Sequence, residues 1–277
     1  MNFDKSRRNL LAIVLMLLVA ATPFSLLASE EHSDQHESDD KGKLYLASDD
    51  ALADLQSTLQ KAERENKLAL VILGANWCHD STALASRLQV EPLKSLVDER
   101  YETLFVNVGN LSEGREVIQS LGVPIYYATP TVLIIDPVSG DLVNEGNRHM
   151  WASAASISMD DSVNYFQTIA DTDLTTLLNA QDYSAEQTQL MAGIDEFEQV
   201  QADRLTEAYI ITGAMLDDNF DQAVWQEVGK YRNSVAADVD ALRAQVAQRI
   251  AEGETDIVLV FPSYPPWSWS AEADNEL

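Results

Sequence analysis

Short apolar runs alternate with amphipathic segments between residues 44 and 170. The run at 68–73 is continuously apolar, as in a central strand that is buried on both faces. Three- and four-residue spacing of apolar side chains predicts helices in the segments between the runs. The elements expected in chain order are a helix from Ser48 or Asp49 to Asn66, the strand at 68–73, a helix after Trp77, a strand at 103–108, a helix at 112–121, a strand at 131–136, its hairpin partner at 141–145, and a helix capped by Ser158 and Asp161 that runs to Ala170. This order predicts an α/β sandwich, to which 44–46 would add a short strand.

The pattern after residue 170 is helical. Apolar residues recur every three or four positions at 190–215 and again at 220–250, which predicts two long amphipathic helices. Asp217, Asp218 and Asn219 interrupt the pattern between them. We therefore expect the two helices to fold back on each other as an antiparallel hairpin.

The C-terminal tail, 257–277, has a different character. It combines an apolar run with three prolines that rule out a regular helix, and with the aromatic residues Tyr264, Trp267 and Trp269. These aromatic side chains either pack back over the body of the protein or form a peptide that binds a partner.

The N-terminus has the organisation of an export signal. Lys5, Arg7 and Arg8 precede an uncharged and mostly apolar stretch at 10–28. We expect cleavage after Ala28 and a periplasmic location in the bacterial envelope. The stretch is also long enough to remain as an uncleaved membrane anchor.

An acidic segment at 29–43 separates this signal from the first apolar pattern. It contains His32 and His36 but almost no apolar side chains, so we expect a disordered linker and not a metal site. The sequence as a whole predicts a signal peptide at 1–28, a linker at 29–43, an α/β domain at 44–170, a helical region at 171–256 and a tail at 257–277.

Charge and cysteine content narrow the range of functions. The chain has 45 Asp and Glu against 18 Lys and Arg, a formal net charge of −27, which argues against a nucleic-acid partner. Its single cysteine excludes an intramolecular disulfide, a CxxC redox pair and a multi-thiolate metal site supplied by this chain alone. Neither a phosphate-binding loop nor a metal-ligand spacing stands out, so we expect no metal and no cofactor.

The strongest chemical signal lies where the strand at 68–73 ends and a helix begins. Cys78 follows Trp77 at this turn. A cysteine at the first turn of a helix lies beside unpaired backbone N–H groups and the positive end of the helix dipole, which stabilise thiolate relative to thiol. We therefore expect an accessible, reactive Cys78 that exchanges with the sulfur of another molecule.

Two motifs together resemble the thioredoxin family. The turn Trp77-Cys78-His79-Asp80-Ser81 resembles the Trp-Cys-x-x-Cys active-site turn of that family, and Thr129-Pro130 before the strand at 131–136 resembles its cis-proline loop, which faces the reactive cysteine. The resemblance covers roughly 44–170. It implies a thioredoxin-like sandwich, followed here by an α-helical hairpin extension, in which Trp77, Thr129 and Pro130 bind substrate.

The departures from the family pattern limit the chemistry. Ser81 stands where the family has its resolving cysteine, and Ile72 stands where many members have a buried acid. The two-cysteine cycle is therefore impossible, and monothiol exchange at Cys78 remains, with protein thiols or disulfides or with a small thiol such as glutathione. Ser81, through a hydrogen bond to the thiolate, and His79 and Asp80 would tune this reaction.

A second function of a different class accounts for the missing cysteine. In this alternative the protein is a non-catalytic binding module or chaperone, Cys78 is a remnant, and a protein partner binds the helical hairpin or the aromatic tail. The reactivity of Cys78 distinguishes the two hypotheses.

Overall fold

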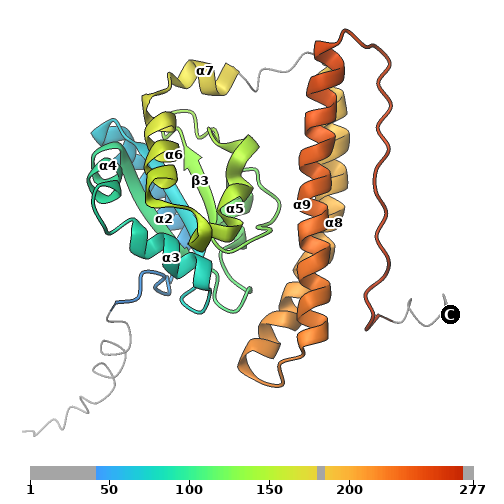
Figure 1. Ribbon diagram of the computed structural model, residues 1–277, viewed down its shortest axis with the longest axis horizontal. Coiled ribbons are helices and arrows are strands. Elements are labelled where there is room, and N and C mark those ends of the chain that lie inside the picture. The colour runs from blue at the N-terminus through green and yellow to red at the C-terminus, as the bar shows by residue number, and fades with distance from the viewer. Residues whose placement is uncertain (1–41, 180–184, 271–277) are drawn as a thin grey trace, which may run out of the picture. The chain divides into compact units, whose positions relative to one another are not determined.

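A mixed three-stranded sheet forms the centre of the α/β part (Figure 1). The computed structural model describes residues 42–179 and 185–270, so residues 1–28, where we expect an export signal, and most of the expected acidic linker, with His32 and His36, lie outside the described residues. The strands are β1 (Leu68–Gly74), β2 (Tyr101–Asn107) and β3 (Thr131–Ile135), in the spatial order β2-β1-β3. β1 pairs in parallel with β2 and antiparallel with β3, with Ile72 opposite both Phe105 and Val132. Every residue of β1 is buried, which confirms the central strand predicted from the apolar run.

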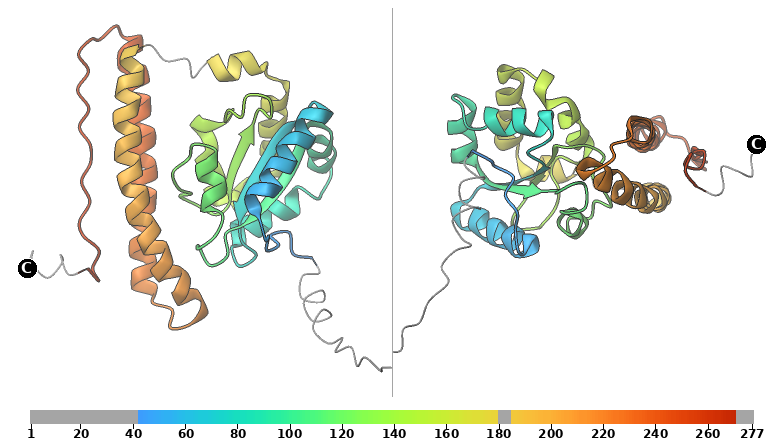
Figure 2. Two further views of the ribbon diagram at one scale, coloured as in Figure 1. Left: turned by 180° about the vertical axis from the view of Figure 1, so that it is seen from behind. Right: turned by 90° about the horizontal axis from the view of Figure 1, so that it is seen from below.

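Helices cover both faces of this sheet (Figure 2). The helices α2 (Ala51–Glu65) and α5 (Arg115–Ser120) lie on one face, and α3 (His79–Arg87), α4 (Leu93–Arg100) and α6 (Met159–Asp171) lie on the other. Successive strand residues point to opposite faces. Val71 therefore packs in the core beneath α2 and α5, whereas Ile72 packs with Leu84 of α3 and Phe166 of α6.

Side chains cap the starts of α2 and α6, and the cap of α2 is one residue later than we expected. Asp50 caps α2, where we expected Ser48 or Asp49; its Oδ1 accepts a hydrogen bond from the Ala53 amide at 2.9 Å. Ser158 caps α6 as expected, and its hydroxyl accepts from the Asp161 amide at 3.0 Å. The short helices α4 and α7 (Leu174–Asn179) were not expected from the pattern.

The hairpin partner expected at 141–145 forms only in part. Leu142 makes an antiparallel bridge with Ile135, the Asp136 amide donates to the Asp141 carbonyl at 3.0 Å, and the Val143 amide donates to the Ile134 carbonyl at 2.8 Å. The pairing then ends, and a 3₁₀ segment, η1 (Glu145–Ser156), follows. The side chain of Asn144 takes the place of strand backbone: its Oδ1 accepts from the Ile134 amide at 2.8 Å, and its Nδ2 donates to the Val132 carbonyl at 2.9 Å. The edge of β3 is thus satisfied partly by the backbone of residues 141–143 and partly by the Asn144 side chain. Residues 44–46 form no strand either.

The C-terminal helices form the expected antiparallel hairpin. α8 (Ala185–Asp217) and α9 (Gln222–Ala251) run side by side (Figures 1 and 2). Asn219 adopts a left-handed conformation in the turn, with φ of 57°, and Asp221 caps α9 by accepting from the Ala223 amide at 2.8 Å. None of the helices among residues 42–179 and 185–270 is long and apolar enough to cross a membrane.

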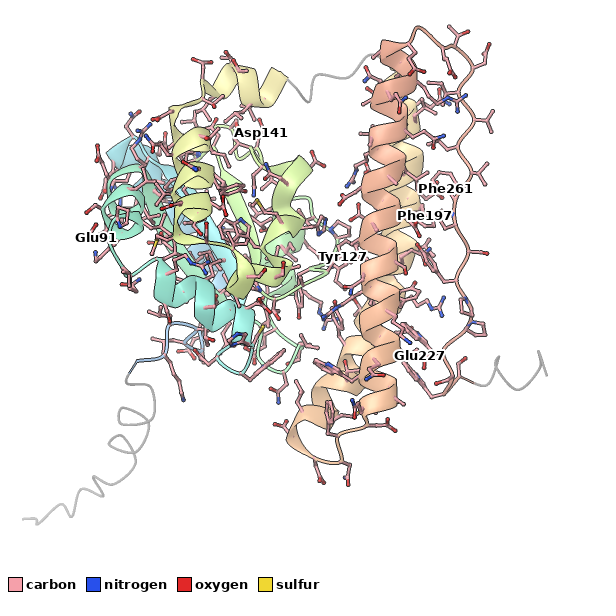
Figure 3. The ribbon with its side chains drawn as sticks, viewed as in Figure 1. Glu91, Tyr127, Asp141, Phe197, Glu227 and Phe261 are labelled. Carbon is pink, nitrogen blue, oxygen red and sulfur yellow. The ribbon has the colours of Figure 1, made fainter. Side chains whose placement is uncertain are left out.

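The tail packs back along the hairpin through aromatic side chains. Phe197 of α8 stacks on Phe261 of the tail, with ring centroids 5.2 Å apart (Figure 3). The guanidinium carbon of Arg204 lies 4.6 Å from the ring centroids of both Tyr231 and Trp267. Arg204 also donates to the carbonyls of residues 264 and 265. The described part of the tail therefore covers the protein's own helices. This agrees with the expectation that its aromatic side chains pack back over the body of the protein.

Tyrosines join the hairpin to the α/β part. Tyr209 of α8 is fully buried; its ring stacks on Tyr126 at 5.4 Å, and its hydroxyl donates to the Tyr126 carbonyl at 2.9 Å. Tyr127 donates to Oε1 of the buried Glu198 at 3.1 Å, and Arg243 of α9 donates to Oε2 of the same carboxylate at 2.8 Å. Residues of both parts thus share one hydrophobic core, and the domain boundary at residue 170 stays a prediction.

Candidate functional site

Cys78 occupies the turn between β1 and α3. It is the residue before the first turn of α3, it is half-buried, and its carbonyl accepts from the Thr82 amide at 3.0 Å. Its Sγ donates to the Thr129 carbonyl at 3.0 Å, and the Thr129-Pro130 peptide is cis. The structure therefore brings the two sequence motifs, 51 residues apart, into direct contact.

Trp77 lies on the outer side of this turn. Its side chain is 43% exposed, and its indole Nε1 donates to the Gly109 carbonyl at 2.8 Å. The ring meets Trp225 of α9 edge to face, with centroids 6.3 Å apart. Sequence reasoning missed Trp225, because its position within a helical pattern gives no sign that it lies beside the turn.

Ser81 is fully buried beneath the turn. Its carbonyl accepts from the Tyr45 hydroxyl at 3.2 Å. A Cβ added to Gly74 would lie 2.7 Å from the Ser81 hydroxyl and 2.6 Å from Cζ of Tyr45, so position 74 requires glycine. Burial raises the pKa of Tyr45 above its ordinary value, so this donor stays protonated in alkaline solution as well as at neutral pH. No hydrogen bond between Ser81 and the Cys78 sulfur occurs among the described residues; the thiol is bonded to Thr129 instead.

His79 and Asp80 form the first turn of α3 without a hydrogen bond to Cys78 within the described ranges. His79 is exposed to solvent. Asp80 accepts from the Ala155 amide at 2.9 Å and so holds the 3₁₀ segment η1 against α3. Ile72 lies fully buried among apolar side chains, so its position supplies no proton acceptor. The arrangement provides one thiol beside a backbone carbonyl, and its proton has to pass to solvent.

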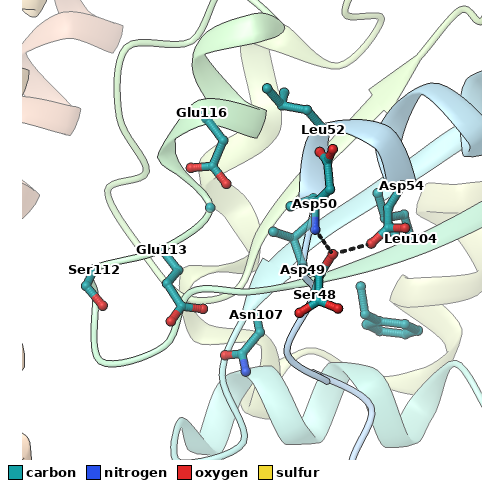
Figure 4. A pocket seen from close by; sticks show the side chains of 14 residues that line it. Ser48, Asp49, Asp50, Leu52, Asp54, Leu104, Asn107, Ser112, Glu113 and Glu116 are labelled. Atoms are coloured by element: carbon teal, nitrogen blue, oxygen red, sulfur yellow. Dashed lines mark hydrogen bonds between the residues drawn. The ribbon is translucent and has the colours of Figure 1, made fainter.

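An acidic pocket of about 330 Å³ lies elsewhere, between the start of α2 and the loop before α5 (Figure 4). Asp50, Asp54, Glu113 and Glu116 line it, but Asp50 and Asp54 are engaged at the start of α2. Among the described residues, no group of three or more His, Cys, Asp or Glu side chains is arranged to hold a metal ion.

Comparisons with known proteins find a family and a solved structure that are similar to part of this chain. Residues 50–137 match the family described as thioredoxin-like. A solved structure of a disulphide isomerase from Xylella fastidiosa Temecula1 is similar, with 27% sequence identity over 46% of this chain and 96% of that chain, and a TM-score of 0.43. No curated protein matches the chain. Residues 50–137 of the α/β part are thus similar to thioredoxin-like proteins, and a helical region follows the α/β part.

Proposed function

We propose that this protein performs monothiol thiol–disulfide exchange at Cys78 on protein substrates. The observation that carries the proposal is the 3.0 Å contact between the Cys78 sulfur and the Thr129 carbonyl. The sulfur lies just beyond the end of the buried strand β1 and beside the Thr129-Pro130 loop, and this position supports the proposal.

The first step forms a mixed disulfide. Cys78 loses its proton to solvent, and its thiolate attacks one sulfur of a substrate disulfide. A bond forms between the Cys78 sulfur and that sulfur, the substrate S–S bond breaks, and the second substrate sulfur leaves as a thiolate. The second step requires an external thiol, because Ser81 cannot act as a resolving residue. Either another cysteine of the substrate or a small thiol such as glutathione attacks the mixed disulfide and releases Cys78.

In this proposal the backbone carbonyl of Thr129, beside Cys78, helps to bind the substrate. The Thr129 carbonyl accepts from the thiol, and it loses that donor when the thiol is deprotonated. It is then available to a backbone N–H of an extended substrate segment. In this proposal Trp77, Thr129 and Pro130 bind the substrate chain on either side of the sulfur.

We assign supporting roles to the rest of the turn. Ser81 packs against Tyr45 and fixes the start of α3, and Asp80 holds the neighbouring 3₁₀ segment. His79 is exposed next to Cys78 in the chain, where an incoming substrate can contact it.

We further propose that the protein is exported to the periplasm. The basic residues before an apolar stretch at 10–28 support this location, which also favours disulfide-bearing substrates. Sequencing the N-terminus of the protein from the envelope fraction tests the proposal. A chain that begins at Ser29 supports a cleaved signal, a chain that keeps 1–28 in the membrane fraction supports an anchor, and a cytoplasmic chain contradicts export.

The catalytic proposal is tested by refolding of a small protein with scrambled disulfides in the presence of a small thiol. We expect the full chain to accelerate the recovery of native pairing, and Cys78→Ser to abolish the acceleration. The variant Asp141→Asn, which changes an exposed acid in the loop after β3, serves as the folded control. If Cys78→Ser assists refolding as well as the natural chain does, the protein acts as a binding module and the catalytic role is wrong.

A further inference from the structure

The end of α8 and the start of α9 contact two neighbouring loops: the turn that carries Trp77 and Cys78, and the loop after β2, to which Trp77 is hydrogen-bonded through the Gly109 carbonyl. We call residues 213–225 the hairpin tip. Asn110 donates to Oδ1 of Asp217 at 2.7 Å, and Trp77 meets Trp225 edge to face. A Cβ on Gly213 would lie 1.9 Å from the Asn110 carbonyl oxygen, so only glycine lets the helix backbone approach this loop so closely. The hairpin tip is therefore seated directly beside Trp77.

Three aromatic rings are grouped at this junction. Trp77 contacts Trp225, whose ring centroid lies 5.8 Å from that of Phe220. Phe220 is 54% exposed, and Trp77 is 43% exposed. We call these three residues the aromatic platform. Large aromatic side chains that stay exposed beside a reactive group are typical of a surface that binds another chain.

The hairpin tip is also strongly acidic. Asp217, Asp218 and Asp221 are all exposed, and the sequence has no lysine or arginine between residues 213 and 229. These carboxylates favour a ligand of opposite charge and speed its approach at low ionic strength. A purely apolar partner would leave them without complementary charge.

We propose that the hairpin tip forms an outer wall of the Cys78 site and selects its substrates. The selected substrates are extended protein segments in which an aromatic or large apolar residue lies next to the reacting cysteine and a lysine or arginine lies nearby. The apolar residue packs on the aromatic platform, and the basic residue faces the tip carboxylates. This inference rests on the proposed function, because it names the substrate class of the same thiol.

Short peptides whose single cysteine carries a thionitrobenzoate group test the selection. The Cys78 thiolate attacks the peptide sulfur, a peptide–Cys78 disulfide forms, and the coloured thionitrobenzoate anion leaves. We expect the full chain to react about two- to tenfold faster when tyrosine replaces glycine beside the cysteine, the range expected for one aromatic contact. Basic peptides should react faster than acidic ones, and added salt should reduce this difference.

Two variants assign these preferences to the hairpin tip. Trp225→Ala should remove most of the preference for tyrosine, and Asp218→Asn should reduce the salt-sensitive preference for basic peptides. Phe261→Ala removes an exposed aromatic ring that stacks on Phe197 and should leave both preferences unchanged.

The outcomes separate this inference from the function on which it rests. Equal rates for all peptides in the natural chain would overturn the selection, whatever the variants do. Preferences that persist undiminished in folded Trp225→Ala and Asp218→Asn would overturn the role of the hairpin tip. If Cys78 fails to react even with a small aromatic disulfide, the proposed exchange chemistry itself fails.

Discussion

Tyr209 joins the helical hairpin to the α/β part, and Tyr209→Phe removes one hydrogen bond at that junction. The ring and its stacking on Tyr126 are kept, but the Tyr126 carbonyl loses the donor that lies 2.9 Å away. A buried carbonyl without its partner costs about 1–2 kcal/mol. We therefore expect the free energy of unfolding at pH 7 to fall by this amount.

The same variant should become the more stable protein in strong alkali. Burial raises the pKa of Tyr209 above the ordinary value of about 10, an effect that Arg232 only partly offsets. The neutral Tyr209 side chain stabilises the folded protein fully when the pH is below the pKa that Tyr209 has in the unfolded chain. This stabilisation is lost as the pH rises from that value toward the higher pKa that Tyr209 has in the folded protein. At about pH 11 ionisation of Tyr209 in the unfolded chain lowers the free energy of unfolding of the natural protein by about 1.4 kcal/mol. The Tyr209→Phe variant has no group that ionises at this position, so its free energy of unfolding is not lowered in this way. The difference between the two proteins should vanish near that pH and reverse above it.

Urea unfolding followed by circular dichroism, at a series of pH values from 7 upward, measures this difference. Ile194→Val is the matched control, because it removes one buried methylene from α8 at a cost of about 1 kcal/mol without a titrating group. Its effect should not change with pH. If Tyr209→Phe lowers the free energy of unfolding by the same amount from neutral to alkaline pH, the conclusion that the Tyr209 hydroxyl is buried with a raised pKa is wrong.

Three further changes test the site, the tail and the domain boundary. Ser81→Cys should allow a disulfide with Cys78 and confer disulfide reductase activity, because positions three apart at a helix start lie within disulfide reach. Arg204→Met should lower the free energy of unfolding by about 1–2 kcal/mol and expose the tail to proteolysis, since Arg204 contacts two aromatic rings and two tail carbonyls. A chain that ends at Asp171 should stay soluble and melt cooperatively, because its own helices cover both faces of the sheet.

Each of these three predictions has a result that would contradict it. Failure of the Ser81→Cys variant to oxidise under mild conditions means that the geometry of the turn is wrong, and Ser86→Cys, at an exposed position later in α3, provides the control. Arg204→Lys keeps the charge but not the planar group, so full stability in that variant would show that stacking contributes nothing. Aggregation of the shortened chain would show that α8 completes the core around Tyr126.

Elements with a strong pattern were predictable from the sequence. The apolar run at 68–73 predicts a buried strand, and the periodic segments on either side of 217–219 predict a helical hairpin; the structure confirms both. The early end of the hairpin partner of β3 was not predictable, because at Asn144 the side chain and not the backbone makes the hydrogen bonds to β3. Alternation of apolar residues does not reveal such a substitution.

The candidate site was predictable only in part. The contact between Cys78 and Thr129 follows from two motifs on neighbouring elements. The buried position of Ser81 against Tyr45, and the approach of Trp225 to Trp77, depend on long-range packing that no local spacing encodes. The residues nearest the thiol could therefore be named from the sequence. The residues that pack around them, Tyr45 and Trp225, could not.

The reaction of Cys78 in the folded protein with a small aromatic disulfide, compared with the same protein unfolded in urea, tests the central claim most directly. Release of the coloured thiolate gives the rate, and Cys78→Ser gives the background. We expect the folded protein to react faster than the unfolded one, because the sulfur lies at the start of α3 on an accessible turn. A thiol that reacts only after unfolding would contradict exchange chemistry at Cys78.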